Sequence, residues 1–307
     1  MSPATTLEAS MVGLLAARAL KSRRSAAVLA RFERSFCLDV GGEPITIGDQ
    51  DLHLGPLNLR LATGDNARLT TVLRIETGQR WVLSPDRLTR SDGLVIDLSK
   101  AVVWRPNAPA TKPDRTRLRE NLDHLHRLLL ERDLPEDGLI SLSLDLGPPR
   151  TATERAALPL LQALKADLPR LLENTANADP ARAARLLGLG PGLTPSGDDL
   201  LAGLLIAWRQ LGAVAAADRL ARALLDGGQE RTTVISLAHL RAAAKGYGAA
   251  PLHDLLDAIF GNHRQGLDEA LDAAAKIGHS SGFDAIAGVM LAFCAWLEAD
   301  NPTSSAA

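Results

Sequence analysis

Two short segments of the chain repeat one pattern of serine, aspartate and glycine. Residues 196–203 are S-G-D-D-L-L-A-G and residues 281–288 are S-G-F-D-A-I-A-G, so the pattern S-G-x-D-x-x-A-G occurs twice. Each copy begins an apolar run with helical spacing, which predicts two helices with a hydroxyl and a carboxylate in the first turn. Such a helix start can bind a polar ligand through its amide N–H groups and these side chains.

The loop before the first copy is rich in glycine, since residues 188–195 are G-L-G-P-G-L-T-P. Glycines let a ligand approach main-chain N–H groups, and the helix start favours an anion, so a small anionic substrate is expected here. Arg231, at another polar helix start, could reach a carboxylate or phosphate. The predicted ligand-binding residues are Gly190, Gly192, Thr194, Ser196, Gly197, Asp199, Arg231, Ser280, Ser281, Gly282 and Asp284.

Helix capping is the structural alternative for part of this pattern. Ser196 with Asp199, and Ser281 with Asp284, have the spacing of a capping box with Asp in place of the usual Glu or Gln. Capping does not explain the glycines of residues 188–192. The pattern therefore predicts well-formed helix starts and leaves a ligand site open in the loops before them.

Two residues are candidates for catalysis because capping does not require them. Asp198 is a second acid beside Asp199, and three roles stay open for it: a Mg²⁺ ligand, an acceptor for an amide or amine, or a structural cap. His279 directly precedes Ser280 and could shuttle a proton, or it is an ordinary loop histidine. No set of residues has zinc spacing, so Mg²⁺ is the only cofactor considered.

Each copy of the repeat ends on a glycine inside the predicted helix. Gly203 and Gly288 each cost about 1 kcal/mol relative to alanine at such a position. Close approach of two backbones offsets that cost. We therefore predict that the two helices cross near these glycines and that the loops before them converge.

The elements that position these residues divide the chain into two halves, which predicts an α+β protein. We predict a small β-rich sheet or barrel over residues 1–150, with an N-terminal helix at 7–34 and one inserted helix near 114–132. Gly147-Pro148-Pro149 marks the change to a helical domain over 151–300, with two central buried helices and a disordered tail at 301–307. The predicted strands are 36–40, 45–47, 57–61, 69–75, 81–83, 94–97, 101–104 and 139–144.

Composition excludes several functions for this chain of 307 residues. A formal net charge of −2 and 3% aromatic residues give no basis for binding nucleic acid or an anionic membrane. Cys37 and Cys294 have no metal or redox spacing and predict buried thiols in a reducing, cytoplasmic setting. The uncharged run 285–297 is short of a membrane span. A soluble globular protein is expected.

The residues G-L-G-P-G-L-T-P-S-G-D-D-L-L-A-G at 188–203 and G-H-S-S-G-F-D at 278–284 carry a resemblance to a known family. With them the chain resembles the bacterial family of the oxamate carbamoyltransferase subunit AllH. The resemblance implies carbamoyl transfer between carbamoyl phosphate and oxamate, giving oxalurate and phosphate, in allantoin and purine breakdown. It also implies an assembly with an FdrA-like subunit, AllF, and a second large subunit, AllG.

Three hypotheses on function remain open from the sequence. The first is a subunit of a carbamoyltransferase with substrate bound at the two helix starts. The second is a scaffold subunit without catalytic residues, whose glycines serve helix packing alone. The third is a freestanding enzyme acting on another small amide or carboxylate. This chain shows no complete set of transferase residues by itself, which favours a site shared with partner subunits.

Overall fold

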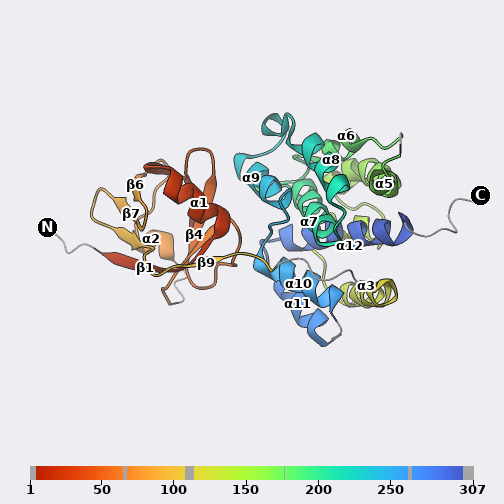
Figure 1. Ribbon diagram of the computed structural model, residues 1–307, viewed down its shortest axis with the longest axis horizontal. Helices are drawn as coiled ribbons and strands as arrows, with labels where there is room; N and C mark the ends of the chain where they lie inside the picture. Colours follow the sequence, from red (N-terminus) through yellow and green to blue (C-terminus); the bar gives the residue numbers. More distant parts are fainter. Residues whose placement is uncertain (1–4, 65–67, 108–113, 176, 262–264, 300–307) are drawn as a thin grey trace, which may run out of the picture. The chain divides into compact units, whose positions relative to one another are not determined.

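The computed structural model describes residues 5–64, 68–107, 114–175, 177–261 and 265–299 (Figure 1). The chain divides into two compact units, Met1–Pro106 and Asn107–Ala307. The first unit holds the strands and the second is helical, so the predicted α+β class is confirmed. The tail at 301–307, for which disorder is predicted, lies outside the described residues.

The first unit is a nine-stranded sheet in the order β5-β4-β3-β2-β6-β7-β8-β1-β9. A further pairing of β5 with β1 closes the sheet into a barrel, so β5, the first strand of this order, has a strand on both sides. Buried and exposed residues alternate along β6, where Trp81 and Leu83 face the core. The strands are β1 Thr6–Gly13, β2 Ser25–Arg31, β3 Ser35–Asp39, β4 Pro44–Gly48, β5 Asn58–Leu61, β6 Arg80–Ser84, β7 Arg87–Arg90, β8 Val95–Asp97 and β9 Val102–Trp104.

The prediction of a helix over residues 7–34 is wrong for most of that segment. Only α1, Leu14–Ser22, is helical, while the segments on both sides of it form β1 and β2. β1 pairs with β5, β8 and β9, so backbone pairing within the barrel outweighs the helical propensity of an Ala- and Leu-rich segment. This is a tertiary effect that the local sequence does not encode.

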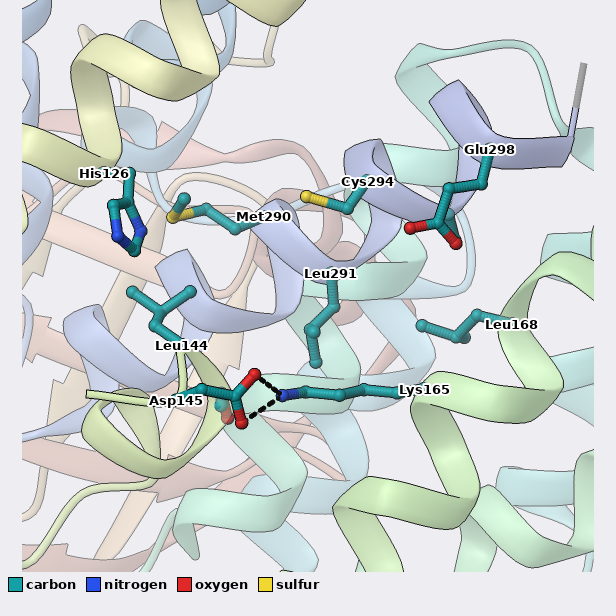
Figure 2. Close-up of a pocket in the computed structure, with 11 residues that line it drawn as sticks. His126, Leu144, Asp145, Lys165, Leu168, Met290, Leu291, Cys294 and Glu298 are labelled. Atoms are coloured by element: carbon teal, nitrogen blue, oxygen red, sulfur yellow. Dashed lines mark hydrogen bonds and ion pairs between the residues drawn. The ribbon is translucent and has the colours of Figure 1, made fainter. Parts of the chain in front are cut away.

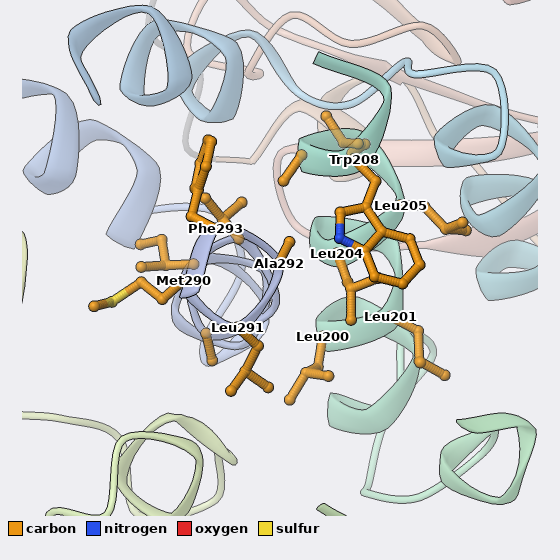
Figure 3. Packing of buried hydrophobic residues seen from close by; sticks show 14 of the residues in the cluster. Leu200, Leu201, Leu204, Leu205, Trp208, Met290, Leu291, Ala292 and Phe293 are labelled. Atoms are coloured by element: carbon orange, nitrogen blue, oxygen red, sulfur yellow. The ribbon is translucent and has the colours of Figure 1, made fainter. Parts of the chain in front are cut away.

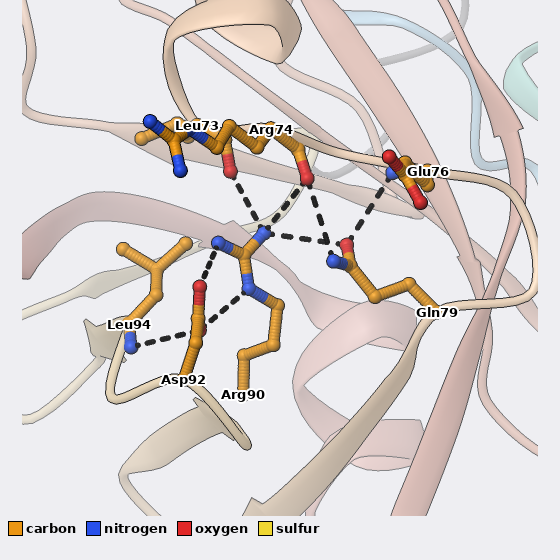
Figure 4. A network of polar contacts seen from close by, with 7 residues as sticks. All are labelled: Leu73, Arg74, Glu76, Gln79, Arg90, Asp92 and Leu94. Atoms are coloured by element: carbon orange, nitrogen blue, oxygen red, sulfur yellow. Dashed lines mark hydrogen bonds and ion pairs between the residues drawn. The ribbon is translucent and has the colours of Figure 1, made fainter.

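The strand predicted at 69–75 is also wrong, because Leu69–Val72 forms the short helix α2. A buried arginine on β7 holds the turn that follows this helix (Figure 4). Arg90 is 5% exposed and donates hydrogen bonds to the carbonyls of Leu73, at 2.8 Å, and Arg74, at 3.3 Å. Its other guanidinium nitrogens donate to Asp92 at 2.8 and 2.6 Å. The arginine thus supplies donors to carbonyls that no strand partner satisfies.

The second unit packs its helices around α7 and α12, so the prediction of two central buried helices is confirmed. Figure 3 shows leucines and Trp208 of α7 facing Ala292 and its neighbours on α12. By length and composition α12 could cross a membrane, but 78% of its apolar window is buried inside the unit. The helices are α3 Arg115–Leu130, α4 Ile140–Ser143, α5 Ala152–Glu173, α6 Pro180–Ala183, α7 Ser196–Gln210, α8 Val214–Leu225, α9 Val234–Ala243, α10 Ala250–Phe260, α11 Gln265–Ala275 and α12 Ser281–Ala299.

The division between the units falls earlier in the chain than residues 147–149. α3 and α4 belong to the helical unit, where Leu122, Leu125 and Ile140 join its single apolar core. The strand predicted at 139–144 is wrong, since four of its residues form α4. A short apolar run bounded by turns can form either a strand or a buried helical turn. Which of the two forms depends on the elements that pack against it in the folded chain.

The two central helices cross at the repeated glycines, as predicted. A Cβ atom added to Gly203 would lie 2.0 Å from the carbonyl oxygen of Ala285, and one added to Gly288 would lie 1.9 Å from that of Leu200. The eighth residue of each copy of the repeat therefore meets the fifth residue of the other copy. This reciprocal contact relates the two helices by a local two-fold symmetry.

Candidate functional site

The crossing brings together the starts of α7 and α12, and with them one buried carboxyl group, that of Asp284, and one half-buried carboxyl group, that of Asp199. Asp199 and Asp284 hold the same position in their copies of the repeat, and we call them the acid pair. A hydrogen bond of 3.0 Å between the hydroxyls of Thr194 and Ser281 joins the two helix starts. Burial raises the pKa of Asp199 most strongly, and the negative charge of Asp284 adds to this rise. The predicted convergence of the loops is confirmed.

Asp284 is fully buried, with 0% of its surface exposed. Its Oδ1 accepts a hydrogen bond of 2.6 Å from the backbone N–H of Leu139. Its Oδ2 has no hydrogen-bond partner among the described residues. Burial raises the pKa of Asp284 to about 7, against the lowering effects of the Leu139 N–H and the nearby hydroxyls of Ser196 and Ser280. Asp284 is therefore a carboxyl group that can gain or lose a proton near neutral pH.

Asp199 has a similar environment on the other helix. Its Oδ2 is inaccessible to solvent and has no hydrogen-bond partner in the described part of the chain. Burial raises its pKa well above the usual range, the hydroxyl of Ser281 opposes this rise, and the charge of Asp284 adds to it. The negative charge of Asp284 thus favours the protonated form of Asp199, since two nearby negative charges repel each other.

Such a pair offers both a hydrogen-bond donor and an acceptor in a place shielded from water. A protonated carboxyl donates to a carbonyl oxygen, while a carboxylate accepts from an N–H group. An amide group presents both of these partners side by side. The two Oδ2 atoms are buried and have no hydrogen-bond partner among the described residues, so this pair has unused capacity for such a group.

The predicted ligand-binding glycines differ in their surroundings. Gly190 has φ +121°, and a Cβ there would lie 2.7 Å from the backbone nitrogen of Ser196, so this glycine lets the loop fold onto the helix start. Gly192 has φ +92° and open space around it. A Cβ at Gly197 or Gly282 would lie 2.1 Å from a backbone carbonyl oxygen of the preceding segment. Close packing accounts for these two and for Gly190, while Gly192 stays open to a ligand.

The first-turn amides of α7 already have partners. The N–H of Gly197 donates to the carbonyl of Leu189 at 2.9 Å, and those of Asp198 and Asp199 donate to the carbonyl of Pro195 at 2.9 and 3.1 Å. The side chain of Ser196 does not cap the helix, because the helix begins at Ser196 and Pro195 occupies the cap position. The capping-box interpretation is thus wrong for this copy, and these three amides are not available to an anion.

The hydrogen bonds of Asp198 join it to residues other than the acid pair. Its Oδ1 accepts from the backbone N–H of Gly188 at 2.7 Å, and its Oδ2 accepts from the hydroxyls of Thr232 and, at 2.6 Å, Ser236. With 1% of its surface exposed, the carboxylate ties the glycine-rich loop to the start of α9. Of its three open roles, the geometry supports a structural one.

His279 and Arg231 have exposed side chains. Among the described residues, no hydrogen bond or ion pair joins either side chain to the acid pair. The backbone carbonyl of Arg231 lies close to Gly188, where an added Cβ would be 2.1 Å from its oxygen. Within the described segments, no three His, Cys, Asp or Glu side chains are placed to hold a metal ion. A role for Mg²⁺ therefore stays a prediction.

The segment before α4 covers the acid pair and was missed by the sequence analysis. Leu139 supplies the N–H that binds Asp284, and the carbonyl of Asp137 accepts a hydrogen bond of 3.3 Å from Ser196. A Cβ at Gly138 would lie 3.1 Å from Oδ1 of Asp284. These contacts come from backbone atoms far away in sequence, so the only local indication was a glycine before a short apolar run.

Part of the helical unit matches a known protein family. Residues 186–293 match the family described as oxamate carbamoyltransferase subunit AllH. No solved structure significantly matches the chain. The description makes the family one subunit of a larger enzyme, so other subunits are implied. The expected resemblance to the AllH family is therefore confirmed over residues 186–293, the segment that holds the glycine-rich loop, both copies of the repeat and the acid pair.

Proposed function

We propose that this chain is a subunit of an oxamate carbamoyltransferase-like enzyme in allantoin and purine breakdown, and that the acid pair binds the amide end of the substrate. One observation carries this proposal. Within the segment that matches the AllH family, Asp199 and Asp284 each keep one buried carboxyl oxygen without a partner. A buried, unsatisfied carboxyl oxygen is costly, and a bound N–H or carbonyl group would satisfy it.

The chemistry of carbamoyl transfer suits such a pair. The amide nitrogen of oxamate attacks the carbamoyl carbon, a C–N bond forms, the C–O bond to phosphate breaks, and phosphate leaves. The attacking nitrogen must lose a proton in this step, and an amide nitrogen is a weak nucleophile. Asp284, with its pKa raised to about 7, can accept that proton at neutral pH.

The phosphate of carbamoyl phosphate needs cationic or N–H donors that the acid pair does not supply. Arg231 is the predicted cation, and its exposed side chain could face a partner subunit. We therefore propose that AllF-like and AllG-like subunits complete the phosphate site. Mg²⁺ is the cofactor that this proposal allows, and a cytoplasmic location belongs to the same proposal.

A scaffold subunit is the second candidate function, and the reciprocal packing of Gly203 and Gly288 favours it. On that hypothesis the repeated glycines serve the helix crossing alone. The two hypotheses differ in what an isosteric change of the acid pair does. A scaffold tolerates loss of the carboxyl charge, whereas a substrate site does not.

The experiment reconstitutes the chain with AllF-like and AllG-like subunits and measures oxalurate formation. Asp199→Asn and Asp284→Asn keep the side-chain shape, so the fold and the assembly with the other subunits should be retained. We expect turnover to fall by about 10²-fold or more, the usual effect of removing a general base. His279→Ala tests the other predicted catalytic residue in the same assay, and a retained turnover would show that this exposed histidine has no catalytic role. Unchanged turnover in both Asn variants would refute the site, and full activity of the chain alone would point to a freestanding enzyme.

A further inference from the structure

A separate cavity of about 300 Å³ lies in the helical unit between α3, α4, α5 and α12 (Figure 2). Its volume is at the lower end of the range of small-molecule sites, about 300–1,000 Å³. Figure 2 shows Leu168 and Leu291 on its walls, with Cys294 above them and the ion pair of Asp145 and Lys165 below. This cavity shares no lining residue with the acid pair, and the proposed function does not use it.

The polar groups of the cavity favour an uncharged ligand. Lys165 donates to both carboxylate oxygens of Asp145, at 2.9 and 2.8 Å, so its positive charge is already balanced. Glu298 is exposed at the rim, where water screens its charge. The remaining lining residues are His126, Ser143 and Cys294 together with five apolar side chains, and none of them carries a fixed charge. A charged ligand would therefore lose its hydration without gaining a free counter-charge.

One hydroxyl in the cavity wall has no partner. Ser143 is 2% exposed, and its Oγ forms no hydrogen bond within the described residues. Buried hydroxyls are normally hydrogen-bonded, so this one points to a bound group that the protein alone does not supply. A hydroxyl both donates and accepts, and a primary amide presents both complements on one small group.

Helix α4 connects this cavity directly to the acid pair. The helix is a single turn, Ile140–Ser143, with Ser143 at the cavity end. At its other end the N–H of Leu139 is bonded to Asp284 at 2.6 Å, and the carbonyl of Leu139 accepts from the N–H of Ser143 at 2.8 Å. Two hydrogen bonds through one residue thus link the cavity wall to the carboxyl group.

We propose that this cavity is a second binding site, for a small uncharged primary amide that hydrogen-bonds to Ser143, and that α4 couples its occupancy to the Leu139–Asp284 contact. The ligand's carbonyl oxygen and N–H group pair with the Ser143 hydroxyl, and its aliphatic part packs against Leu168 and Leu291. Binding at this site does not depend on the proposed carbamoyl transfer, so either can fail without the other.

The cysteine of the cavity gives a direct measure of binding. Cys294 is exposed at the cavity, so the prediction of a buried thiol is wrong for this residue. Cys37 is 1% exposed, as predicted, and serves as an internal control. Burial raises the pKa of the Cys294 thiol, and the charge of Glu298 adds to this, so alkylation is followed at alkaline pH by mass spectrometry. The alkylating reagent is 4-vinylpyridine, which has no amide group and so does not belong to the proposed ligand class. Propionamide is the probe. Propionate and propylammonium, which have the same ethyl group but carry a charge, are the comparators.

We expect propionamide to slow alkylation of Cys294 several-fold, and the two charged comparators to slow it much less. Ser143→Ala should abolish this protection. Ser141→Ala is the matched control, because Ser141 lies on the same turn but bonds Arg150 outside the cavity lining, and its protection should persist. Absence of protection, equal protection by a charged comparator, or protection unaffected by Ser143→Ala would overturn the site.

Hydrogen exchange tests the coupling. With propionamide bound, we expect the backbone N–H of Leu139 to exchange several-fold more slowly, because α4 is held at its other end. The same measurement on Ser143→Ala should show no change on adding the probe. Protection of Cys294 together with unaltered Leu139 exchange would overturn the coupling while leaving the binding site in place.

Discussion

Replacing Gly288 by alanine should destabilise the helical unit, although alanine is the better helix former. On helical propensity alone the change would gain about 1 kcal/mol. The new Cβ, however, would lie 1.9 Å from the carbonyl oxygen of Leu200 and 2.8 Å from the backbone nitrogen of Leu204. Both atoms belong to the backbone of α7, so no side-chain rotation relieves the contact. The two central helices must move apart by more than an ångström to restore ordinary contact distances.

The cost of that movement exceeds the propensity gain. Overpacking of a well-packed core costs about 1–3 kcal/mol, and here it acts on rigid backbone at the centre of the unit. We therefore expect the Gly288→Ala variant to lose about 2 kcal/mol or more in the free energy of unfolding. Urea unfolding followed by circular dichroism measures this loss as a lower midpoint at an unchanged slope.

A second helical glycine provides the control. A Cβ at Gly266, on α11, would meet nothing within 4 Å, so Gly266→Ala should be neutral or stabilise by up to about 1 kcal/mol. Gly203→Ala, which would place a Cβ 2.0 Å from the carbonyl oxygen of Ala285, should behave like Gly288→Ala. A Gly288→Ala protein as stable as the parent would refute the close crossing of the helices and the symmetry drawn from it.

Three further predictions follow from buried polar groups. The pKa of Asp284 is raised to about 7 from about 3.9 in the unfolded chain, so the folded state binds a proton more tightly than the unfolded state. The free energy of unfolding should therefore fall as the pH rises from about 4 through 7. Asp284→Asn should remove this part of the loss, so above pH 7 its thermal midpoint should be higher than that of the parent protein. Asp198→Ala leaves three donors without their acceptor and should cost roughly 3 kcal/mol in urea unfolding, whereas a purely catalytic aspartate would be removed at little cost in stability. Arg90→Lys should destabilise the barrel unit by roughly 2 kcal/mol, because lysine cannot reproduce the forked contacts of the guanidinium group. Arg87→Lys is the control: Arg87 forms a surface ion pair with Asp97 at 3.6 Å, and its replacement should change the free energy of unfolding by less than about 0.5 kcal/mol.

The helical half of the fold could be predicted because its pattern is local. Apolar residues at helical spacing predict a buried helix whatever its neighbours are, and an interior glycine predicts a close contact since it is otherwise unfavourable. These two rules were enough for α7, α12 and their crossing. The barrel was harder to predict, because an Ala- and Leu-rich stretch such as β1 becomes a strand only through pairing with β5 and β8.

The roles of the individual acids depended on contacts that spacing does not reveal. Asp198 and Asp199 are neighbours in sequence, but successive residues on a helix point in different directions. One therefore meets Gly188, Thr232 and Ser236 and is fully hydrogen-bonded. The other turns toward α12 and keeps an oxygen without a partner. From the sequence, Asp198 was the acid without a structural explanation. In the structure Asp198 is fully hydrogen-bonded, and Asp199 is the acid that has an oxygen without a partner.

By itself the sequence determined the repeated helix starts, the glycine crossing and the resemblance to the AllH family, because each depends on residues close together in the chain. Only the tertiary structure decided which carboxyls are buried together and which remain unsatisfied. The N–H of Leu139 meets Asp284 across 145 positions of sequence, and burial of that carboxyl depends on how α4 closes over it. Burial and pairing set a carboxyl group's pKa, and both are properties of the folded chain.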